Sequence, residues 1–254
     1  MTSQMQDLKD EIRQAFEKFE PAWQGELSGV IRNLARSDAD YFESYLELVS
    51  LNAWRKDLLS TTISSDSVSF FLEAQNDGLV SHVFARMGAW RSALKSLRSC
   101  MEDMVLCLYF KDHPVELSLW NSGKFKPGFS STIEYLRRHP LIDGIEHSLT
   151  GIDILEKEYS TLSRAVHGSA QFQMTGGTGG STSLWTDDVT SLGKWRTREH
   201  LVLQSINLLL LTIFRENLQG TQRPQLRRAI SFAVSPSKIP AIKAKLGITL
   251  TPPK

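Results

Sequence analysis

An arginine and a histidine lie one helical turn apart in the stretch SRAVHGSA, where Arg164 and His167 are followed at once by Gly168. A glycine directly after a periodic segment is typical of a helix C-terminus, and the helix dipole there favours a protonated imidazole. Since histidine changes charge near neutral pH, His167 could serve as a general acid or base. Arg164 could hold a phosphate and stabilise the charge that develops when a P–O bond breaks. The pair has the chemistry for metal-independent RNA cleavage, with the RNA 2′-hydroxyl as nucleophile.

The same two residues also allow a purely structural interpretation. Arg164 could pair with a nearby carboxylate such as Glu156 or Glu102, and His167 could cap free carbonyl groups at the helix end. The spacing alone favours this structural interpretation, so the catalytic hypothesis needs support from elsewhere in the chain.

Other kinds of site find little support in the residue pattern. None of the six histidines forms an HxxxH pair and the chain has no CxxC motif, so we expect no metal. The segment TGGTGGSTS lacks the lysine of a phosphate-binding loop and follows no strand. We therefore expect a flexible Gly/Ser/Thr-rich loop over 168–183 and no cofactor, with nucleotide binding as the weaker alternative. Cys100 and Cys107 lie in an apolar helical segment, where structural thiols are usual.

Composition indicates an ordinary globular protein of 254 residues, with 41% hydrophobic and 22% charged residues. The N-terminus shows no secretion signal, and the longest apolar run, 201–214, is too short to span a bilayer. Two cysteines too far apart on a helix to pair indicate a reducing compartment, so we expect a cytoplasmic protein without membrane contact.

The net charge of +1 hides a strong asymmetry along the chain. The segment 190–254 has 11 Lys/Arg and two acidic residues, which gives +9, whereas the preceding 189 residues carry −8. A basic segment of this kind can bind nucleic acid, an acidic partner or the acidic face of its own protein. The sequence leaves these three possibilities open.

Helical periodicity dominates the chain and predicts an all-α, multi-helix bundle. Apolar stripes predict one helix over 8–19 and another over 23–34, separated at Pro21. Two long central helices are expected, one over 79–110 and one over 193–220, closed by Gly220. We expect residues 1–220 to form the bundle and 221–254 to form a basic C-terminal extension with short helices.

One face of the segment 79–110 carries Arg91, Lys95, Arg98 and Glu102 at helical spacing. This segment, RSALKSLRSCMEDMVLCLYF, and the later helix end YSTLSRAVHGS resemble the HEPN-like superfamily, especially its bacterial branch. The resemblance covers roughly 79–218. It implies an all-α bundle that often dimerises, and many members are metal-independent ribonucleases of toxin–antitoxin, abortive-infection or CRISPR-linked defence systems.

By this resemblance Arg164 would bind the phosphate and His167 would be the acid/base, with Glu102 or Arg98 as a supporting polar group. The chain departs from the family motif, since only two residues separate Arg164 from His167, and Arg196 and His200 in RTREH miss the pattern as well. Many members are inactive binding or dimerisation modules.

We therefore expect an RNA-cleaving or RNA-binding protein of the defence or toxin type. We also expect a homodimer that binds RNA, a cognate inhibitor or a defence-system protein. The alternative is a non-catalytic helical module whose basic C-terminus docks an acidic protein or nucleic acid. The expected RNA or partner contacts are the basic residues Arg91, Lys95, Arg196, Arg198, Arg223, Arg227 and Arg228.

Overall fold

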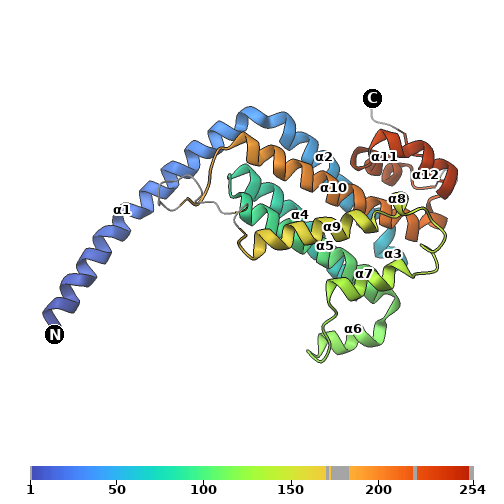
Figure 1. The fold of residues 1–254 in the computed structure, drawn as a ribbon, viewed down its shortest axis with the longest axis horizontal. Helices are drawn as coiled ribbons and strands as arrows, with labels where there is room; N and C mark the ends of the chain where they lie inside the picture. The colour runs from blue at the N-terminus through green and yellow to red at the C-terminus, as the bar shows by residue number, and fades with distance from the viewer. Residues whose placement is uncertain (1, 170–171, 173–182, 220–221, 252–254) are drawn as a thin grey trace.

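The computed structural model describes residues 2–169, 172, 183–219 and 222–251 of the chain. The chain is 82% helical, and the described residues contain no strand, which confirms the all-α prediction. The helices form a bundle from which one long helix projects (Figure 1). Within the described part of the chain, no helix combines the length and the apolarity that crossing a membrane requires.

The projecting helix is α1, Thr2–Leu34, which runs unbroken through Pro21. The prediction of two separate helices on either side of this proline was wrong. A proline inside a helix leaves the carbonyl four residues earlier without its partner. That residue, Glu17, is exposed, as is Pro21, so water can hydrate the freed carbonyl.

A short 3₁₀ turn, Ala35–Ser37, joins α1 to α2, Asp38–Trp54. A π-helical turn, Arg55–Leu59, and α3, Ser60–Thr62, continue the same path. The next helix, α4, spans Ser65–Arg86 and begins at the Ser64 side chain, which accepts a hydrogen bond from the Ser67 amide.

The long helix expected over 79–110 is instead a hairpin of α4 and α5, Trp90–Asp112. The reversal occurs at Gly88, whose φ of +68° suits glycine alone. The Gly88 carbonyl accepts a hydrogen bond from the Thr186 amide at 3.1 Å, and a Cβ at Gly88 would collide with the Thr186 carbonyl oxygen. The turn therefore also anchors the segment that leads into α10.

Replacing Gly88 by alanine is expected to destabilise the protein by about 2 kcal/mol or more. The left-handed conformation costs a residue with a Cβ about 1–2 kcal/mol, and the collision with the Thr186 backbone adds to this cost. The matched control is Gly123→Ala, because Gly123 has a φ of +71° with open space around it. Urea unfolding of the two variants measures the collision as their difference, and equal losses would contradict it.

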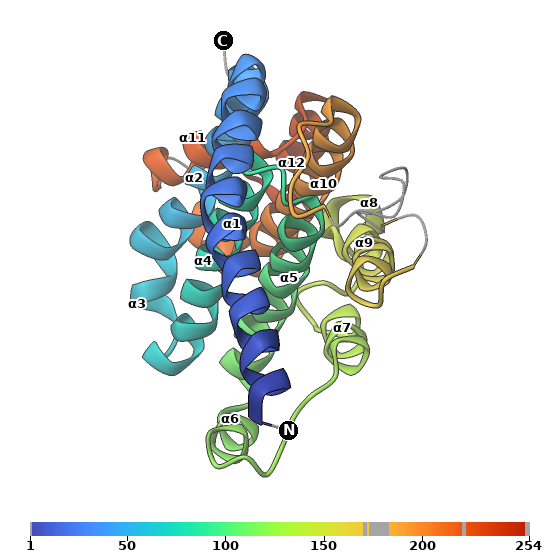
Figure 2. The same cartoon turned by 90° about the vertical axis from the view of Figure 1, so that its left-hand side faces the viewer.

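The middle of the chain supplies smaller helices and then a second long one. Figures 1 and 2 show α6, Pro114–Asn121, and α7, Phe129–Arg137, at the edge of the bundle, followed by α8, His147–Thr150, and α9, Ile152–Val166. The long helix α10, Val189–Ile213, starts at Asp188, whose carboxylate accepts hydrogen bonds from the Thr190 and Ser191 amides.

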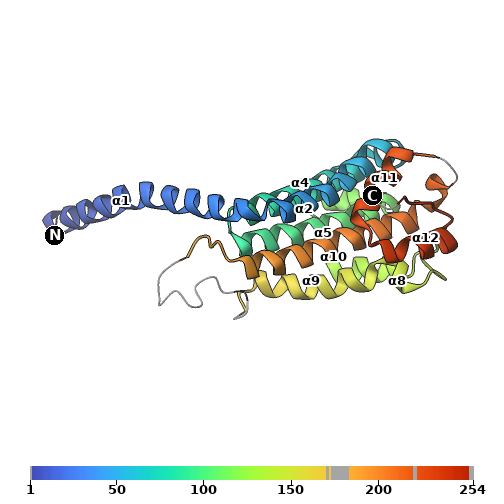
Figure 3. The same ribbon diagram turned by 90° about the horizontal axis from the view of Figure 1, so that it is seen from above.

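Helices α5 and α10 contact each other and α9 at the centre of the bundle, as Figure 3 shows. The two long central helices are thus confirmed, with different ends. The second helix was predicted to run to Gly220, but it ends at Ile213 and a 3₁₀ turn, Arg215–Leu218, follows. Gly220 lies outside the described residues, and so does most of the loop predicted over 168–183.

The basic C-terminal segment forms α11, Pro224–Ala233, a 3₁₀ turn, Pro236–Lys238, and α12, Ile239–Leu246. Helix α11 packs on α2 and α10. Its apolar residues Leu226 and Ile230 are fully buried and belong to the same hydrophobic core as the rest of the bundle. The segment that the sequence marks as an extension is therefore packed into the fold.

Candidate anion-binding site

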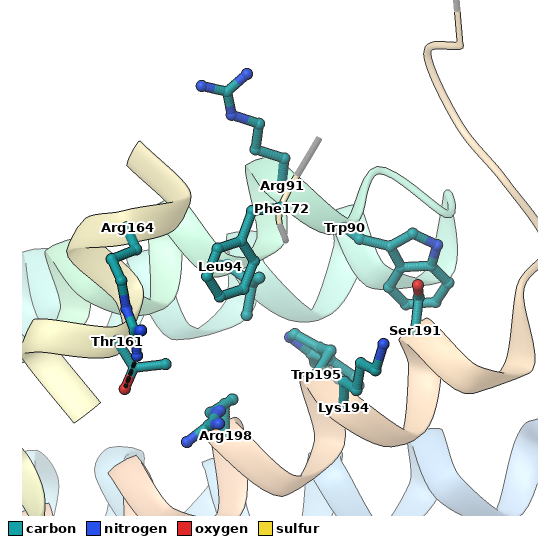
Figure 4. Close-up of a pocket in the computed structure, with 10 residues that line it drawn as sticks. All are labelled: Trp90, Arg91, Leu94, Thr161, Arg164, Phe172, Ser191, Lys194, Trp195 and Arg198. Atoms are coloured by element: carbon teal, nitrogen blue, oxygen red, sulfur yellow. Dashed lines mark hydrogen bonds between the residues drawn. The ribbon is translucent and has the colours of Figure 1, made fainter. Parts of the chain in front are cut away.

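A cavity of about 310 Å³ opens at the end of the bundle where the first turns of α5 and α10 meet the last turns of α9 (Figure 4). We call it the α9–α10 pocket. Its lining residues are Trp90, Arg91, Leu94, Thr161, Arg164, Phe172, Ser191, Lys194, Trp195 and Arg198. Four of these ten side chains are cationic and none is acidic, so the pocket has a positive electrostatic potential that favours an anion.

Arg164 and Lys194 are the cations most available to a ligand. Both side chains are exposed. The Arg164 guanidinium donates one long hydrogen bond, 3.4 Å, to the hydroxyl of Thr161, and Lys194 contacts no polar partner among the residues that the structure describes. Arg198 projects from α10 toward the Arg164 side of the pocket in Figure 4. One of its nitrogens donates to Glu158 at 2.7 Å.

The structural alternative for Arg164, pairing with Glu156 or Glu102, is wrong. Glu156 accepts from Arg137 at 3.1 Å, and Glu102 accepts from Arg98 at 3.0 Å. Both carboxylates are thus held by other arginines. Arg164 points into the pocket (Figure 4), and within the described part of the chain no carboxylate pairs with it.

The carbonyl groups at the end of α9 are capped by an arginine from another helix. The Arg91 guanidinium donates to the carbonyls of Ala165 at 3.0 Å and Val166 at 3.3 Å. In Figure 4 the Arg91 side chain consequently points away from the other three cations. The capping role that the sequence offered to His167 therefore belongs to Arg91.

His167 is the last residue of the α9 turn, and Gly168 follows with a φ of +71°, which confirms the predicted helix end. The imidazole is exposed, and it makes no hydrogen bond with the described residues. His167 does not line the α9–α10 pocket. The structure therefore places Arg164 in the pocket and His167 one turn further along the same helix.

Arg98 and Glu102, the predicted supporting residues, lie elsewhere on α5. Arg98 donates to Glu102 at 3.0 Å and to the hydroxyl of Tyr159 at 2.7 Å, and its guanidinium lies over the Tyr159 ring. That ring stacks on Phe129 with 3.7 Å between centroids. Glu102 lines a separate cavity of about 190 Å³. The four predicted catalytic residues are thus divided between two places.

Arg196, a predicted RNA or partner contact, is held inside the bundle. Its guanidinium binds the carboxylates of Glu47 and Glu199, and Glu47 also accepts from Nδ1 of His200 at 2.9 Å. Burial would raise the pKa of Glu47, but the hydrogen bonds from His200 and Arg196 outweigh it and lower that pKa. The side chains of Glu47 and Glu199 occupy Arg196, so an incoming phosphate would have to displace them.

The remaining predicted contacts lie outside the pocket. Lys95 is exposed on α5 and is not a lining residue. Arg223, Arg227 and Arg228 lie on or next to α11, toward the opposite end of α10 (Figure 1). Of these, Arg228 is exposed and Arg227 donates to the carbonyl of Thr249 at 3.4 Å. The structure therefore brings together only Arg91, Arg164 and Arg198 from the predicted set.

Seven of the ten lining residues were not predicted from the sequence, and four of them are Lys194, the two tryptophans Trp90 and Trp195, and Phe172. Lys194 stands one helical turn before Arg198 in GKWRTR, a spacing that was visible in the sequence. The two tryptophans were not identifiable, because long-range contacts hold them. The indole of Trp90 donates to Thr186, and that of Trp195 donates to the hydroxyl of Ser81. The fourth, Phe172, is half-buried.

The described residues contain no group of three His, Cys, Asp or Glu side chains that could hold a metal ion. Both cysteines are buried, and burial raises the pKa of Cys107 to about 12. These thiols are therefore packing groups, as the sequence indicated.

No protein-family model, no curated protein and no solved structure matches this chain.

Proposed function

We propose that this protein binds single-stranded RNA, with one phosphate of the strand held in the α9–α10 pocket by Arg164, Lys194 and Arg198. The observation that carries the proposal is the arrangement of these three cations around a cavity whose lining includes no carboxylate. Arginine matches the geometry of phosphate oxygens, and charge-assisted hydrogen bonds to phosphate are about twice as strong as neutral ones.

The size and walls of the pocket support a nucleotide as its occupant. A cavity of about 310 Å³ is at the small end of the ~300–1,000 Å³ range of ligand pockets. It therefore suits one nucleotide unit of a longer strand. The half-buried ring of Phe172 offers a face on which a base can stack, an interaction that tolerates any base sequence.

Cleavage of the bound strand is the second candidate function. The observation that favours it is that Arg164 forms no ion pair with the described residues, and that the exposed imidazole of His167, one turn away, forms no hydrogen bond with them. In such a reaction the RNA 2′-hydroxyl loses its proton and attacks the adjacent phosphorus. The bond to the 5′-oxygen breaks, and that oxygen takes up a proton. His167 would transfer one of these protons, and Arg164 would stabilise the developing negative charge.

Replacing Arg164 or Lys194 by alanine is expected to weaken binding of a fluorescently labelled single-stranded RNA by about 10- to 100-fold each. This range corresponds to one charge-assisted hydrogen bond of about 1.5–3 kcal/mol. Each loss should also reduce the slope of log K against log salt by about 0.7, as expected for one phosphate contact. Arg198 is a poor choice for substitution, because it would leave the buried Glu158 unpaired.

Arg228→Ala is the matched control, since Arg228 is exposed on the basic C-terminal segment. If RNA binding falls with Arg228→Ala and is unchanged by Arg164→Ala, the basic C-terminus is the binding surface and the pocket proposal is wrong. Binding that does not depend on salt would also contradict it. A parallel incubation with total RNA in EDTA separates the two candidate functions, because cleavage that is lost in both Arg164→Ala and His167→Ala supports catalysis. RNA that stays intact while it binds supports binding alone.

A further inference from the structure

Five large apolar side chains form a stripe along the projecting part of α1. Each is between 50% and 59% exposed, and the residues are Met5, Leu8, Ile12, Phe16 and Phe19. Figures 1 and 3 show this part of the helix extending away from the bundle. No other described part of the same chain covers the stripe.

The stripe continues without a break into the part of α1 that packs on the bundle. After Phe19 the same alternation of three and four residues reaches Trp23, Leu27, Val30 and Leu34. Val30 and Leu34 are buried against the bundle, and Trp23 contacts Trp185 with 5.9 Å between ring centroids. The pattern repeats every eleven residues, which keeps one face of a nearly straight helix apolar over its whole length. The face that packs on the bundle is therefore the face that is exposed beyond it.

We propose that residues 5–19 of α1 pair with the same segment of a second copy in an antiparallel two-helix coiled coil. This inference stands independently of the RNA-binding proposal, because it uses none of the residues of the α9–α10 pocket.

The area available on the stripe is sufficient for such a pair. Aromatic side chains bury roughly 150–250 Å² each, so large side chains exposed by half or more, as here, contribute on the order of 100 Å² each. Five of them on each of two copies, with the flanking side chains, reach the ~1,000 Å² that a specific interface needs.

The charges on α1 favour a protein partner over a membrane surface. Residues 5–20 contain five acidic and three basic side chains, whereas helices that lie on anionic membranes carry mostly Lys and Arg on their polar face. Lys9 and Glu20 occupy equivalent positions on the same edge of the stripe, each four residues after a stripe residue. In an antiparallel pair the same edges face each other, so Lys9 of each copy lies on the edge that also carries Glu20 of the other, about five residues or ~7.5 Å along the axis from the position directly opposite it.

The bundle itself decides the orientation. In a parallel pair, residues 23–34 of the second helix would run along the stripe face of the first helix, and the first copy's own bundle occupies that face. An antiparallel pair centred on Ile12 ends before Trp23 on both sides. It places Met5 opposite Phe19, Leu8 opposite Phe16, and the two Ile12 side chains opposite each other.

The mass of the full chain in solution tests the pairing. Analytical ultracentrifugation of the wild type is expected to show a dimer at micromolar concentration, and Phe16→Ser is expected to weaken it by about 100-fold or more, because each dimer buries two copies of this ring. The matched control is Phe42→Ser on α2, since Phe42 is 59% exposed and Phe16 is 58% exposed. Circular dichroism should show both variants folded, because neither ring belongs to the core.

Disulfide trapping tests the orientation. Ile12→Cys should cross-link to itself, whereas Met5→Cys should not, because antiparallel pairing separates the two Met5 positions by about 21 Å along the axis. The native Cys100 and Cys107 are buried and do not interfere. A monomeric wild type, a dimer that survives Phe16→Ser, cross-linking through Met5→Cys, or sedimentation of the chain with anionic vesicles would each overturn the proposal.

Discussion

The ionisation of Glu199 is expected to lower the stability of the wild type as pH rises from about 4.5 to about 8. The Glu199→Gln variant is expected to lack this loss. Glu199 is fully buried between α10 and α2. Burial raises its pKa from 4.5 to about 8, and the charge of Arg196 and the hydrogen bond with Ser44 only partly oppose this rise. At neutral pH the folded protein therefore keeps a proton on this carboxyl.

The sign of the effect follows from the two pKa values of Glu199. Its pKa is higher in the folded state, so its contribution to stability is complete below pH 4.5 and is lost as pH rises through about 8. Between these values unfolding releases one proton, which lowers the free energy of unfolding by about 1.4 kcal/mol per pH unit. Glutamine resembles the protonated carboxyl and does not titrate. The difference in free energy of unfolding between wild type and Glu199→Gln should therefore fall steadily with pH.

The difference in free energy of unfolding between wild type and Glu199→Gln is more informative than the pH profile of either protein, because His82 titrates in an overlapping pH range. Burial lowers the pKa of His82 from 6.5 to about 4, so this group adds stability as pH rises from about 4 to 6.5. It thus opposes Glu199 below pH 6.5. Above pH 6.5 His82 is neutral in both the folded and the unfolded state, so it no longer opposes Glu199. The wild type should therefore lose stability there as pH rises.

Urea unfolding at several pH values between 5 and 9 measures the effect. Glu43→Gln on the exposed face of α2 serves as the control and should follow the wild type at every pH. Parallel profiles for wild type and Glu199→Gln would mean that Glu199 is ionised in the folded protein and shares Arg196 with Glu47.

Replacing Glu47 by alanine is expected to destabilise the protein by about 3–5 kcal/mol, the usual cost of removing one partner from a buried ion pair. Glu47 is 4% exposed and accepts hydrogen bonds from Arg196 and His200. Without it, the largely buried Arg196 would keep only Glu199, which holds a proton at neutral pH. The charge of the guanidinium would be left without a compensating anion.

Thermal unfolding of Glu47→Ala should show a melting temperature lower by roughly 10 °C, given about 2–4 °C per kcal/mol for a protein of this size. The control is Glu43→Ala, one turn earlier on α2, with an expected change within about 0.5 kcal/mol. Two results would contradict the prediction: a loss below about 1 kcal/mol in Glu47→Ala, or equal losses in the two variants.

The secondary structure was largely predictable because helical periodicity and capping are local. The apolar spacing predicted the all-α class and both central helices, and Gly168 predicted the end of α9. The hairpin at Gly88 was not predictable, because its tight turn is stabilised by a hydrogen bond to Thr186, about one hundred residues away. The predicted boundary at Pro21 was wrong, because in a solvent-exposed helix water can hydrate the carbonyl that the proline leaves free.

The candidate site was predictable only in part, for the same reason. Local spacing identified Arg164 as a possible phosphate ligand, but it could not show that Glu156 and Glu102 bind other arginines. Arg196 was predicted as an RNA or partner contact, but it belongs to a buried ion pair, whose partner Glu47 is 149 residues away.

What the sequence by itself determined was the helices, their apolar faces and the residue types able to bind a phosphate. These properties depend on neighbours within a turn or two of the same helix. Only the tertiary structure decided which charges remain uncompensated. Arg196 and Arg198 lie two residues apart, yet Arg196 points into the bundle and pairs with Glu47, while Arg198 pairs with Glu158 and lines the pocket beside Arg164. Neighbouring residues on a helix point in different directions, and the packing of distant helices decides which groups each side chain contacts.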